Sequence, residues 1–185
     1  MSNRISEAFA KGKAFIPFIT CGDPSLEITE QLVYAMEEAG ADLIELGIPF
    51  SDPTAEGPVI QEANVRALSG GDKIFDMVVK IRKKTSIPMV FMTYANVVFS
   101  YGTERFIRKA AEIGMDGLIL PDVPFEEKEE FDVVCKQYGL ELISLIAPTS
   151  HDRITRIAKE ANGFVYCVSS LGVTGTRTQI TTDIG

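Results

Sequence analysis

The chain has 185 residues, of which 45% are hydrophobic and 24% are charged, and its formal net charge is −8. This composition is typical of one globular domain, which buries about 70% of its unfolded surface. The acidic balance and the lack of a basic patch argue against nucleic-acid binding. No apolar run approaches the ~20 residues needed to cross a bilayer, and the N-terminal residues carry no apolar signal region, so a cytoplasmic protein outside the membrane is expected.

Apolar runs alternate with segments of helical periodicity along the whole chain. The predicted helices span residues 2–11, 26–39, 59–68, 72–84, 104–113, 126–138 and 152–161. The predicted strands span residues 14–20, 42–46, 89–92, 117–120, 142–146 and 164–168. Gly40, Gly114 and Gly139 each follow a helix, where a C-terminal cap is expected. No linker or low-complexity stretch divides the chain, so residues 1–185 are predicted to form a single domain.

The alternation of apolar strands with helices predicts a parallel sheet with both faces covered. Two architectures fit this pattern, a TIM (β/α)8 barrel and an open doubly wound sheet. The first strand–helix turn lacks G-x-G-x-x-G, which weakens the second. Polar residues gather after the strand ends, where a barrel keeps its active site, and this favours the barrel. These residues are Thr20, Glu45, Tyr94, Asn96, Asp122, Thr149 and Ser169.

The number of repeating units does not complete a barrel. A TIM barrel has eight units in typically ~250 residues. The pattern predicts about six βα units and ends after Gly185 in a segment that resembles a loop. The expected fold is therefore a barrel whose C-terminal part, with two further units, is missing.

The strongest chemical signal lies in residues 45–58, which follow the apolar run 41–44 and are rich in Gly and Pro. This segment carries the carboxylates Glu45, Asp52 and Glu56. A carboxylate that closes a buried strand is costly unless function requires it. Apolar neighbours would raise the pKa of Glu45 and suit a general acid–base role, and the alternative is a carboxylate paired with a nearby amide or Arg. Glu56 would face the same pocket, unless it is an ordinary solvated loop residue.

Residues 168–177 are small, polar and Gly-bearing. They fit a mobile lid whose Thr174 hydroxyl and Arg177 charge would meet an anionic substrate, or else an ordinary flexible tail. The basic residues at 80–84 are interpreted as a solvated helix end, where cations suit the helix dipole.

Histidine and cysteine usage excludes several kinds of chemistry. His151 is the one histidine and is expected at the surface near a helix start, so His-based metal sites and Ser-His-Asp or Cys-His mechanisms are not expected. Cys21, Cys135 and Cys167 lie far apart without C-x-x-C spacing, which indicates a reducing compartment and no disulfide frame or zinc site. Cys167 lies in an apolar run and is predicted to be in the core.

Taken together, these motifs resemble those of the tryptophan synthase α subunit. The loop Glu45-Leu46-Gly47-Ile48-Pro49-Phe50-Ser51-Asp52-Pro53, followed by Gly57-Pro58 and Gln61, matches the signature of that family. Further matches occur in the same order, at Pro17-Phe18-Ile19-Thr20 with Gly22-Asp23-Pro24, at Tyr94-Ala95-Asn96, at Asp122-Val123-Pro124 and at Gly172-Val173-Thr174-Gly175. The resemblance covers essentially the whole chain.

The resemblance implies a lyase of tryptophan biosynthesis, which cleaves indole-3-glycerol phosphate to indole and glyceraldehyde 3-phosphate in a retro-aldol step. The family's proton-shuttling glutamate falls on Glu45. Its second carboxylate, which accepts the indole N–H, falls on Glu56, where the family usually has Asp. The extra methylene of Glu56 lengthens its reach by roughly 1.5 Å.

The resemblance also assigns the rest of the site. Phe18, Tyr94 and Tyr166 fall on positions that line the indole pocket or orient the catalytic carboxylate, while Thr174 and Gly175 fall on the mobile lid. The family binds the substrate phosphate through loops after its seventh and eighth strands, which would follow the end of this chain. A truncated chain without these loops is expected to turn over poorly, because remote binding energy orients the reacting centre.

The resemblance further implies that this subunit uses neither metal nor organic cofactor. Pyridoxal phosphate is expected only in a β subunit, which receives indole directly and completes an α2β2 heterotetramer. The family interface lies near residues 49–58 and 94–96. One alternative is a catalytically weak truncated barrel that keeps only the β-subunit-binding surface. Another is a different phosphate-handling barrel, such as an epimerase or aldolase, against which the absence of Lys from the predicted strands argues.

Overall fold

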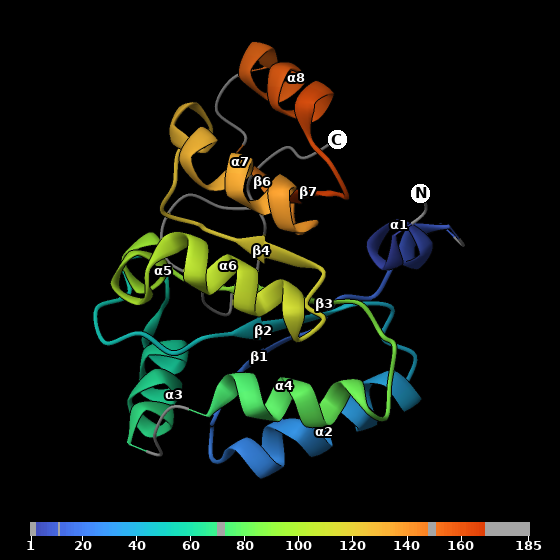
Figure 1. The fold of residues 1–185 in the computed structure, drawn as a ribbon, viewed down its shortest axis with the longest axis vertical. Helices are drawn as coiled ribbons and strands as arrows, with labels where there is room; N and C mark the ends of the chain where they lie inside the picture. Colours follow the sequence, from blue (N-terminus) through green and yellow to red (C-terminus); the bar gives the residue numbers. More distant parts are fainter. Residues whose placement is uncertain (1–2, 11, 70–72, 148–150, 169–185) are drawn as a thin grey trace.

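A computed structural model describes residues 3–10, 12–69, 73–147 and 151–168. The strands are β1 (Phe18–Thr20), β2 (Ile44–Gly47), β3 (Met89–Met92), β4 (Gly117–Ile119), β5 (Glu141–Leu142), β6 (Ser144–Ile146) and β7 (Val165–Cys167). The helices are α1 (Arg4–Phe9), α2 (Leu26–Glu38), α3 (Pro58–Leu68), α4 (Ile74–Arg82), α5 (Ala95–Tyr101), α6 (Thr103–Glu112), the 3-10 turn η1 (Phe125–Glu127), α7 (Glu129–Tyr138) and α8 (His151–Glu160), arranged as Figure 1 shows.

The strands pair in parallel and in chain order. One sheet has the order β1-β2-β3-β4-β5, and β6 pairs with β7. A doubly wound sheet reverses its order at a switch point, whereas a barrel adds each strand beside the previous one. The order therefore confirms the barrel prediction for the described part of the chain.

The predicted strand 142–146 is divided at Ile143. Its first half, β5, pairs with β4, and its second half, β6, pairs with β7. The Ile143 amide still donates to the Leu118 carbonyl at 2.9 Å. The chain thus turns from one neighbour to the other at this residue, and a single predicted strand becomes two.

Alternate residues of each strand serve two different cores. On the outer face, Ile44, Phe91 and Leu118 pack against helix residues in one large cluster. On the inner face, Leu43, Val90, Ile119 and Ile143 form a second cluster with Ile5 of α1. Figure 1 shows the covering helices in adjacent pairs, with α2 beside α4 and α6 beside α7.

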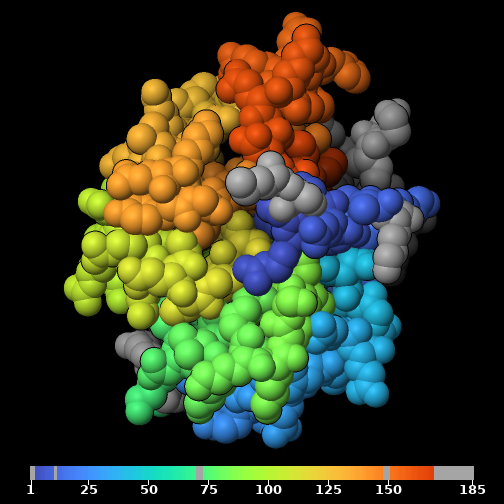
Figure 2. Space-filling model, turned by 45° about the vertical axis from the view of Figure 1, so that its right-hand side comes forward, coloured from blue at the N-terminus to red at the C-terminus, as the bar shows by residue number. Residues whose placement is uncertain are grey.

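Helix α1 closes the inner face at the end where the strands begin. Phe9 lies with its ring centroid 5.4 Å from that of Phe164. Arg4 Nε is 2.6 Å from Asp116 Oδ1, and Asn3 Nδ2 donates to Glu141 Oε1 at 2.8 Å. In Figure 2 the blue N-terminal segment lies between the orange and red C-terminal elements and the green and light-blue ones.

Asp116 is the centre of a partly buried charged network. Its carboxylate accepts from Arg4, from Arg82 Nη2 at 2.7 Å and from the Met89 amide at 2.9 Å. Arg82 also donates to the Gly114 and Ile87 carbonyls, and burial lowers its pKa to about 10. The interpretation of residues 80–84 as a solvated helix end is therefore wrong for Arg82, although its three lysine neighbours are exposed.

Helix α5 was not predicted, because its sequence lacks helical signals. Val97, Val98 and Phe99 are β-branched or aromatic residues that favour strands. The helix is instead capped from a distance, since the Ala95 amide donates to both oxygens of Asp122 at 3.0 and 3.1 Å. Local periodicity cannot reveal a cap that lies 27 residues away.

The cysteine predictions are confirmed in part. All three thiols are free, and Cys21 and Cys135 are buried. Cys167 is exposed, so its placement in the core was wrong. It ends β7, which pairs only with β6 among the described residues. His151 is exposed at the start of α8, as predicted, and no helix in the described ranges is long and apolar enough to cross a membrane.

Thiol titration checks this distribution. Under native conditions we expect Ellman's reagent to modify one thiol per chain rapidly, and all three after unfolding in urea. The reason is that burial raises the pKa of the Cys21 and Cys135 thiols to about 12, which leaves little of the reactive thiolate. Cys167→Ser should abolish the fast phase. Rapid modification of two or more thiols in the folded protein would contradict the structure.

Candidate active site

Glu45 lies on the inner face of the barrel in the middle of β2. Its neighbours in register are Phe18 on β1 and Val90 on β3, whose side chains project to the same face. The residue is 5% exposed. Every residue of β2 is buried, so Glu45 is a carboxylate within an otherwise apolar strand.

Burial raises the pKa of Glu45 from its ordinary value of 4.5 to about 7. Among the described residues, no hydrogen bond or salt bridge to its carboxylate offsets the loss of solvent. A carboxyl group with a pKa near 7 can both accept and return a proton at neutral pH. The alternative reading, a carboxylate paired with an amide or Arg, is therefore not supported.

Tyr166 on β7 belongs to the same inner face. Burial is the main cause that raises the pKa of Tyr166, and the charge of Glu45 raises it further. The side chain packs against the inner cluster together with Met92 and Leu145. Tyr166 and Glu45 are therefore electrostatic neighbours, although they are 121 residues apart in the sequence.

Glycine is required at position 47 for a steric reason, which the sequence did not predict. A Cβ atom at this position would lie 2.5 Å from Cζ and 2.7 Å from Cε2 of Phe18. The ring of Phe18 therefore lies directly over the backbone of β2, two residues from Glu45. The available signal was the glycine inside an otherwise apolar strand end, which indicates a close approach by another group.

Gly47→Ala should displace the Phe18 ring and destabilise the fold by about 1–3 kcal/mol, which is typical of overpacking. Urea unfolding at pH 7 measures the change. Phe18→Leu should restore most of the loss in the double variant, because it removes the ring atoms that the new methyl group would meet. Equal destabilisation in the single and double variants would contradict this explanation.

The second carboxylate, Glu56, is held by Tyr94. The Tyr94 hydroxyl donates to Glu56 Oε2 and accepts from the Ala55 amide at 3.0 Å. The ring centroids of Tyr94 and Phe50 are 5.3 Å apart. Gln61 Nε2 donates to the Glu56 carbonyl at 2.9 Å. Glu56 is thus an ordered, half-buried residue, and not a solvated one.

The structure divides the predicted site residues into two groups. Glu45, Phe18 and Tyr166 share the inner face of the barrel, and Glu56 and Tyr94 meet at its rim. The charge of Glu45 acts on Tyr166, whereas that of Glu56 acts on Tyr94, where burial raises the pKa to about 12 and the Glu56 hydrogen bond adds to the effect.

That the two carboxylates share one substrate pocket stays a prediction. The lid residues Thr174, Gly175 and Arg177 lie outside the described residues. Within the described ranges, no three His, Cys, Asp or Glu side chains lie close enough to hold a metal ion.

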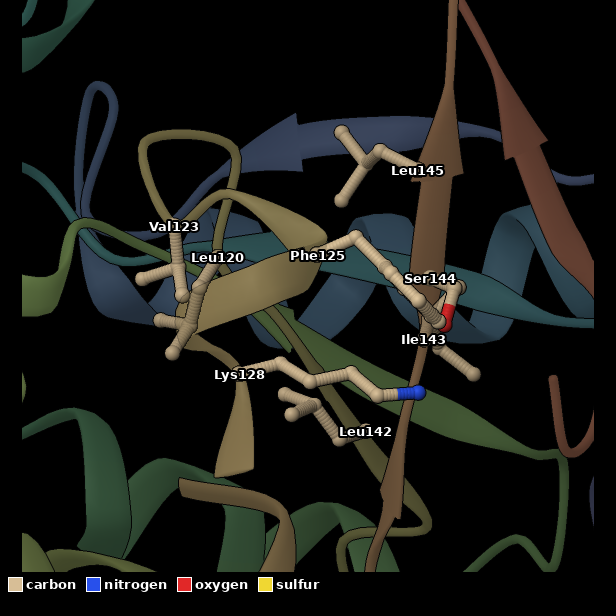
Figure 3. A pocket seen from close by; sticks show the side chains of 8 residues that line it. All are labelled: Leu120, Val123, Phe125, Lys128, Leu142, Ile143, Ser144 and Leu145. Carbon is tan, nitrogen blue, oxygen red and sulfur yellow. The ribbon is translucent and has the colours of Figure 1, made fainter. Parts of the chain in front are cut away.

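A separate hollow lies where β5 gives way to β6, beside the loop that follows β4. Figure 3 shows its eight lining residues, which include Phe125, Lys128 and Ser144. Lys128 Nζ lies 4.0 Å from the centre of the Phe125 ring. None of the predicted site residues lines this hollow, and its lining contains no carboxylate.

Comparison with known proteins gives a consistent result. The sequence profile of the family described as "Tryptophan synthase alpha chain" matches residues 6–185. The tryptophan synthase alpha chain of Alkaliphilus metalliredigens is 57% identical over 171 residues, which are 91% of this chain and 64% of that protein. The corresponding protein of Caldanaerobacter subterraneus is 53% identical over 175 residues, 93% of this chain and 67% of the relative.

Solved structures agree with the sequence relatives. A crystal structure of a tryptophan synthase alpha chain from Legionella pneumophila has a TM-score of 0.84 at 40% identity, over 91% of this chain and 67% of that one. A tryptophan synthase complex from Pyrococcus furiosus has a TM-score of 0.78 at 38% identity, over 83% and 65% of the two chains. The chain thus spans about two thirds of the length of the proteins it resembles, and 64% of the first relative named.

Proposed function

The chain belongs to the tryptophan synthase alpha chain family, and we propose that it forms the site that cleaves indole-3-glycerol phosphate to indole and glyceraldehyde 3-phosphate. The observation that carries the proposal is the burial of Glu45 on an apolar strand, which raises its pKa to about 7. A retro-aldol cleavage needs a group that gives and takes a proton near neutral pH.

Glu45 and Glu56 have separate roles in this reaction. Glu45 protonates C3 of the indole ring and takes the proton of the adjacent side-chain hydroxyl. The C–C bond then breaks, its electron pair restores the aromatic ring, and the hydroxyl carbon becomes the aldehyde of the triose phosphate. Glu56 accepts a hydrogen bond from the indole N–H while positive charge develops on the ring.

The remaining residues bind and enclose the substrate. Phe18, Tyr94 and Tyr166 provide apolar ring surfaces for the indole, and Thr174 and Gly175 are proposed to belong to the lid. Proton transfer between carboxyls and substrate requires neither a metal nor an organic cofactor, so none is proposed for this subunit.

We also propose a β subunit as the partner, in an α2β2 complex with pyridoxal phosphate on the β side. One of the solved relatives is described as the tryptophan synthase a2b2 complex of Pyrococcus furiosus. Phe99 of α5 is 48% exposed and Asn96 is exposed, and both lie on the helix that begins at the Glu56-binding Tyr94. Free, separated thiols support a cytoplasmic location.

An indole-release assay tests the proposed function. It compares the 185-residue chain with a form extended by the C-terminal third of the Alkaliphilus metalliredigens relative. Because the family binds the substrate phosphate through the loops after its seventh and eighth strands, we expect the extended form to release indole much faster. No release by the extended form would overturn the proposal. Stimulation of a β subunit without any indole release would support the alternative of a binding module alone.

A further inference from the structure

We propose that Asp23 and Arg66 are positioning residues, whose ion pair holds α3 against the turn after β1 and thereby fixes the loop that carries Glu56. The inference rests on the proposed function, in which Glu56 accepts a hydrogen bond from the indole N–H. It adds two charged side chains that act on the reaction only through Glu56.

Arg66 and Asp23 form a two-pronged ion pair between α3 and the turn that follows β1. Arg66 Nε donates to Asp23 Oδ1 and Arg66 Nη2 donates to Asp23 Oδ2, both at 2.8 Å. A planar guanidinium that meets both oxygens of a carboxylate fixes direction as well as distance. The hydrogen bonds from Arg66 are the main cause that holds the pKa of Asp23 below its ordinary value. The pair is therefore ionised at neutral pH.

The turn that carries Asp23 is held by the elements on both sides of it. Thr29 of α2 is fully buried, and its hydroxyl accepts from the Gly22 amide at 3.0 Å. The Cys21 amide donates to the Gly47 carbonyl of β2 at 2.8 Å. Asp23 is thus a fixed point, to which Arg66 attaches α3.

Helix α3 has little else that fixes its position. In Figure 1 it lies to the left of α2 and α4 and runs across their direction. Its buried residues are small, and they are Ala63, Asn64 and Ala67. Val59 and Val65 are 71% and 70% exposed, and the N-cap residue Gly57 supplies no side-chain hydrogen bond. Because small residues bury little apolar area, we expect the ion pair to supply a large share of what holds α3.

The position of α3 reaches Glu56 through the first turn of the helix. Gln61 Nε2 donates to the Glu56 carbonyl at 2.9 Å, and the Gln61 amide donates to the Gly57 carbonyl at 3.1 Å. Arg66 lies in the last turn of the same 11-residue helix. A movement at the Arg66 end therefore displaces Gln61 and, with it, the backbone of Glu56.

Hydrogen exchange on the 185-residue chain provides the first test. Arg66→Gln and Asp23→Asn each remove one charge and keep nearly the same shape. In either variant the amides of Ala55 and Gln61 should exchange about three- to tenfold faster, because the loop and the first turn of α3 open more often. The double variant should exchange no faster than the single ones, since one ion pair is lost in each case. Unaltered exchange of both amides would overturn the proposal.

Arg108→Gln on α6 is the matched control. The Arg108 side chain is 54% exposed, compared with 53% for Arg66, and it also pairs with one carboxylate, Glu112. This variant should leave the Ala55 and Gln61 amides unchanged. Exposed ion pairs contribute little to stability, so the urea midpoints of all variants should stay near the parental one. A lower midpoint with faster exchange throughout the chain would indicate a general structural contact and overturn the positioning role.

Steady-state kinetics provide the second test, on the form that releases indole in a Glu45-dependent manner. A misplacement of ~1 Å can cost about 100-fold in rate, and a loosened loop is misplaced only part of the time, so Arg66→Gln should lower kcat by about 3- to 10-fold. KM should change by less than about twofold, because the contact of Glu56 strengthens in the transition state. Arg66→Lys keeps the charge without the fork and should recover part of the loss.

Glu56→Ala identifies the residue through which the pair acts. Adding Arg66→Gln to Glu56→Ala should lower kcat by less than a further factor of about two, because the carboxylate that the pair positions is already absent. Multiplied losses would overturn the proposal. If no form releases indole, the proposed function fails and the positioning role fails with it. If the parent releases indole and Arg66→Gln keeps the parental kcat, only the positioning role fails.

Discussion

Glu45→Gln is expected to lower the kcat for indole release by about 10²–10⁴-fold, the usual contribution of general acid–base catalysis. Gln has nearly the same shape but cannot take or return a proton at neutral pH. The measurement is made on the form of the protein that releases indole. Glu38→Gln, at an exposed position of α2, serves as the control and should leave kcat unchanged. More than a tenth of the parental rate in Glu45→Gln would contradict the proton-shuttling role.

The same variant should stabilise the fold at alkaline pH. The pKa of Glu45 is about 7 in the folded protein and 4.5 without burial. Between pH 4.5 and 7 the unfolded chain has lost this proton while the folded chain retains it, so the free energy of unfolding falls as pH rises. The loss is fully established above pH 7 and amounts to about 3 kcal/mol, since one pKa unit corresponds to about 1.4 kcal/mol.

Urea unfolding at pH 4.5 and pH 8 separates these contributions. Glu45→Gln should resemble the parent at the lower pH and exceed its stability by about 3 kcal/mol at the higher one. Glu38→Gln should show no such pH-dependent gain. A constant difference at both pH values would show that side-chain shape, and not ionisation, is responsible. Stability that is given up for a titratable group at this position is typical of an active site.

Asp116→Ala is expected to have the largest effect on stability, a loss of about 3–5 kcal/mol, because it leaves a buried cation without its partner. The Arg82 side chain is 11% exposed and that of Asp116 is 9% exposed. The substitution also removes the acceptor for Arg4 and for the Met89 amide that begins β3. For a chain of this size, the melting temperature should fall by roughly 10 °C.

The control for Asp116→Ala is Asp132→Ala on α7. Asp132 pairs with the exposed Lys136 one helical turn away, at 2.6 Å. Such pairs contribute only about 0.3–0.5 kcal/mol. Each variant removes one carboxylate, which pairs with two arginines at Asp116 and with one exposed lysine at Asp132, so thermal and urea unfolding compare a partly buried network with an exposed pair. A loss in Asp116→Ala no larger than in the control would contradict the assignment of this network as a stabilising contact.

The regular part of the fold was predictable from local patterns. Apolar runs of four to seven residues between helices of 3.6 periodicity indicated the parallel strands, and polar residues at the strand ends indicated the side that carries the site. Glu45 stood out because an ionisable group is rare in such a run. Each of these signals depends on residues that are close together in the chain, so a short stretch of sequence is enough to reveal it.

The missed features depend on contacts between distant residues. The cap on α5 comes from Asp122, and the burial of Arg82 comes from Asp116 and from the turn at Gly114. Cys167 has the surroundings of a core residue in the sequence, but its neighbours in space decide its exposure. The tie between Tyr94 and Glu56 spans 38 residues and required the register of the strands to be known.

The long-range contacts of helix α1 affect the order in which the chain can fold during synthesis. Its contacts reach forward by 112 residues from Arg4 to Asp116 and by 138 residues from Asn3 to Glu141. At a synthesis rate of about 5–20 residues per second, the ribosome needs roughly 6 to 28 seconds to supply these partners. Until then α1 has only its local cap, the Asn3 side chain on the Ser6 amide. Helix α1 therefore completes its polar contacts only after β5 has been made, although Leu43 and Val90 of its apolar cluster are made earlier.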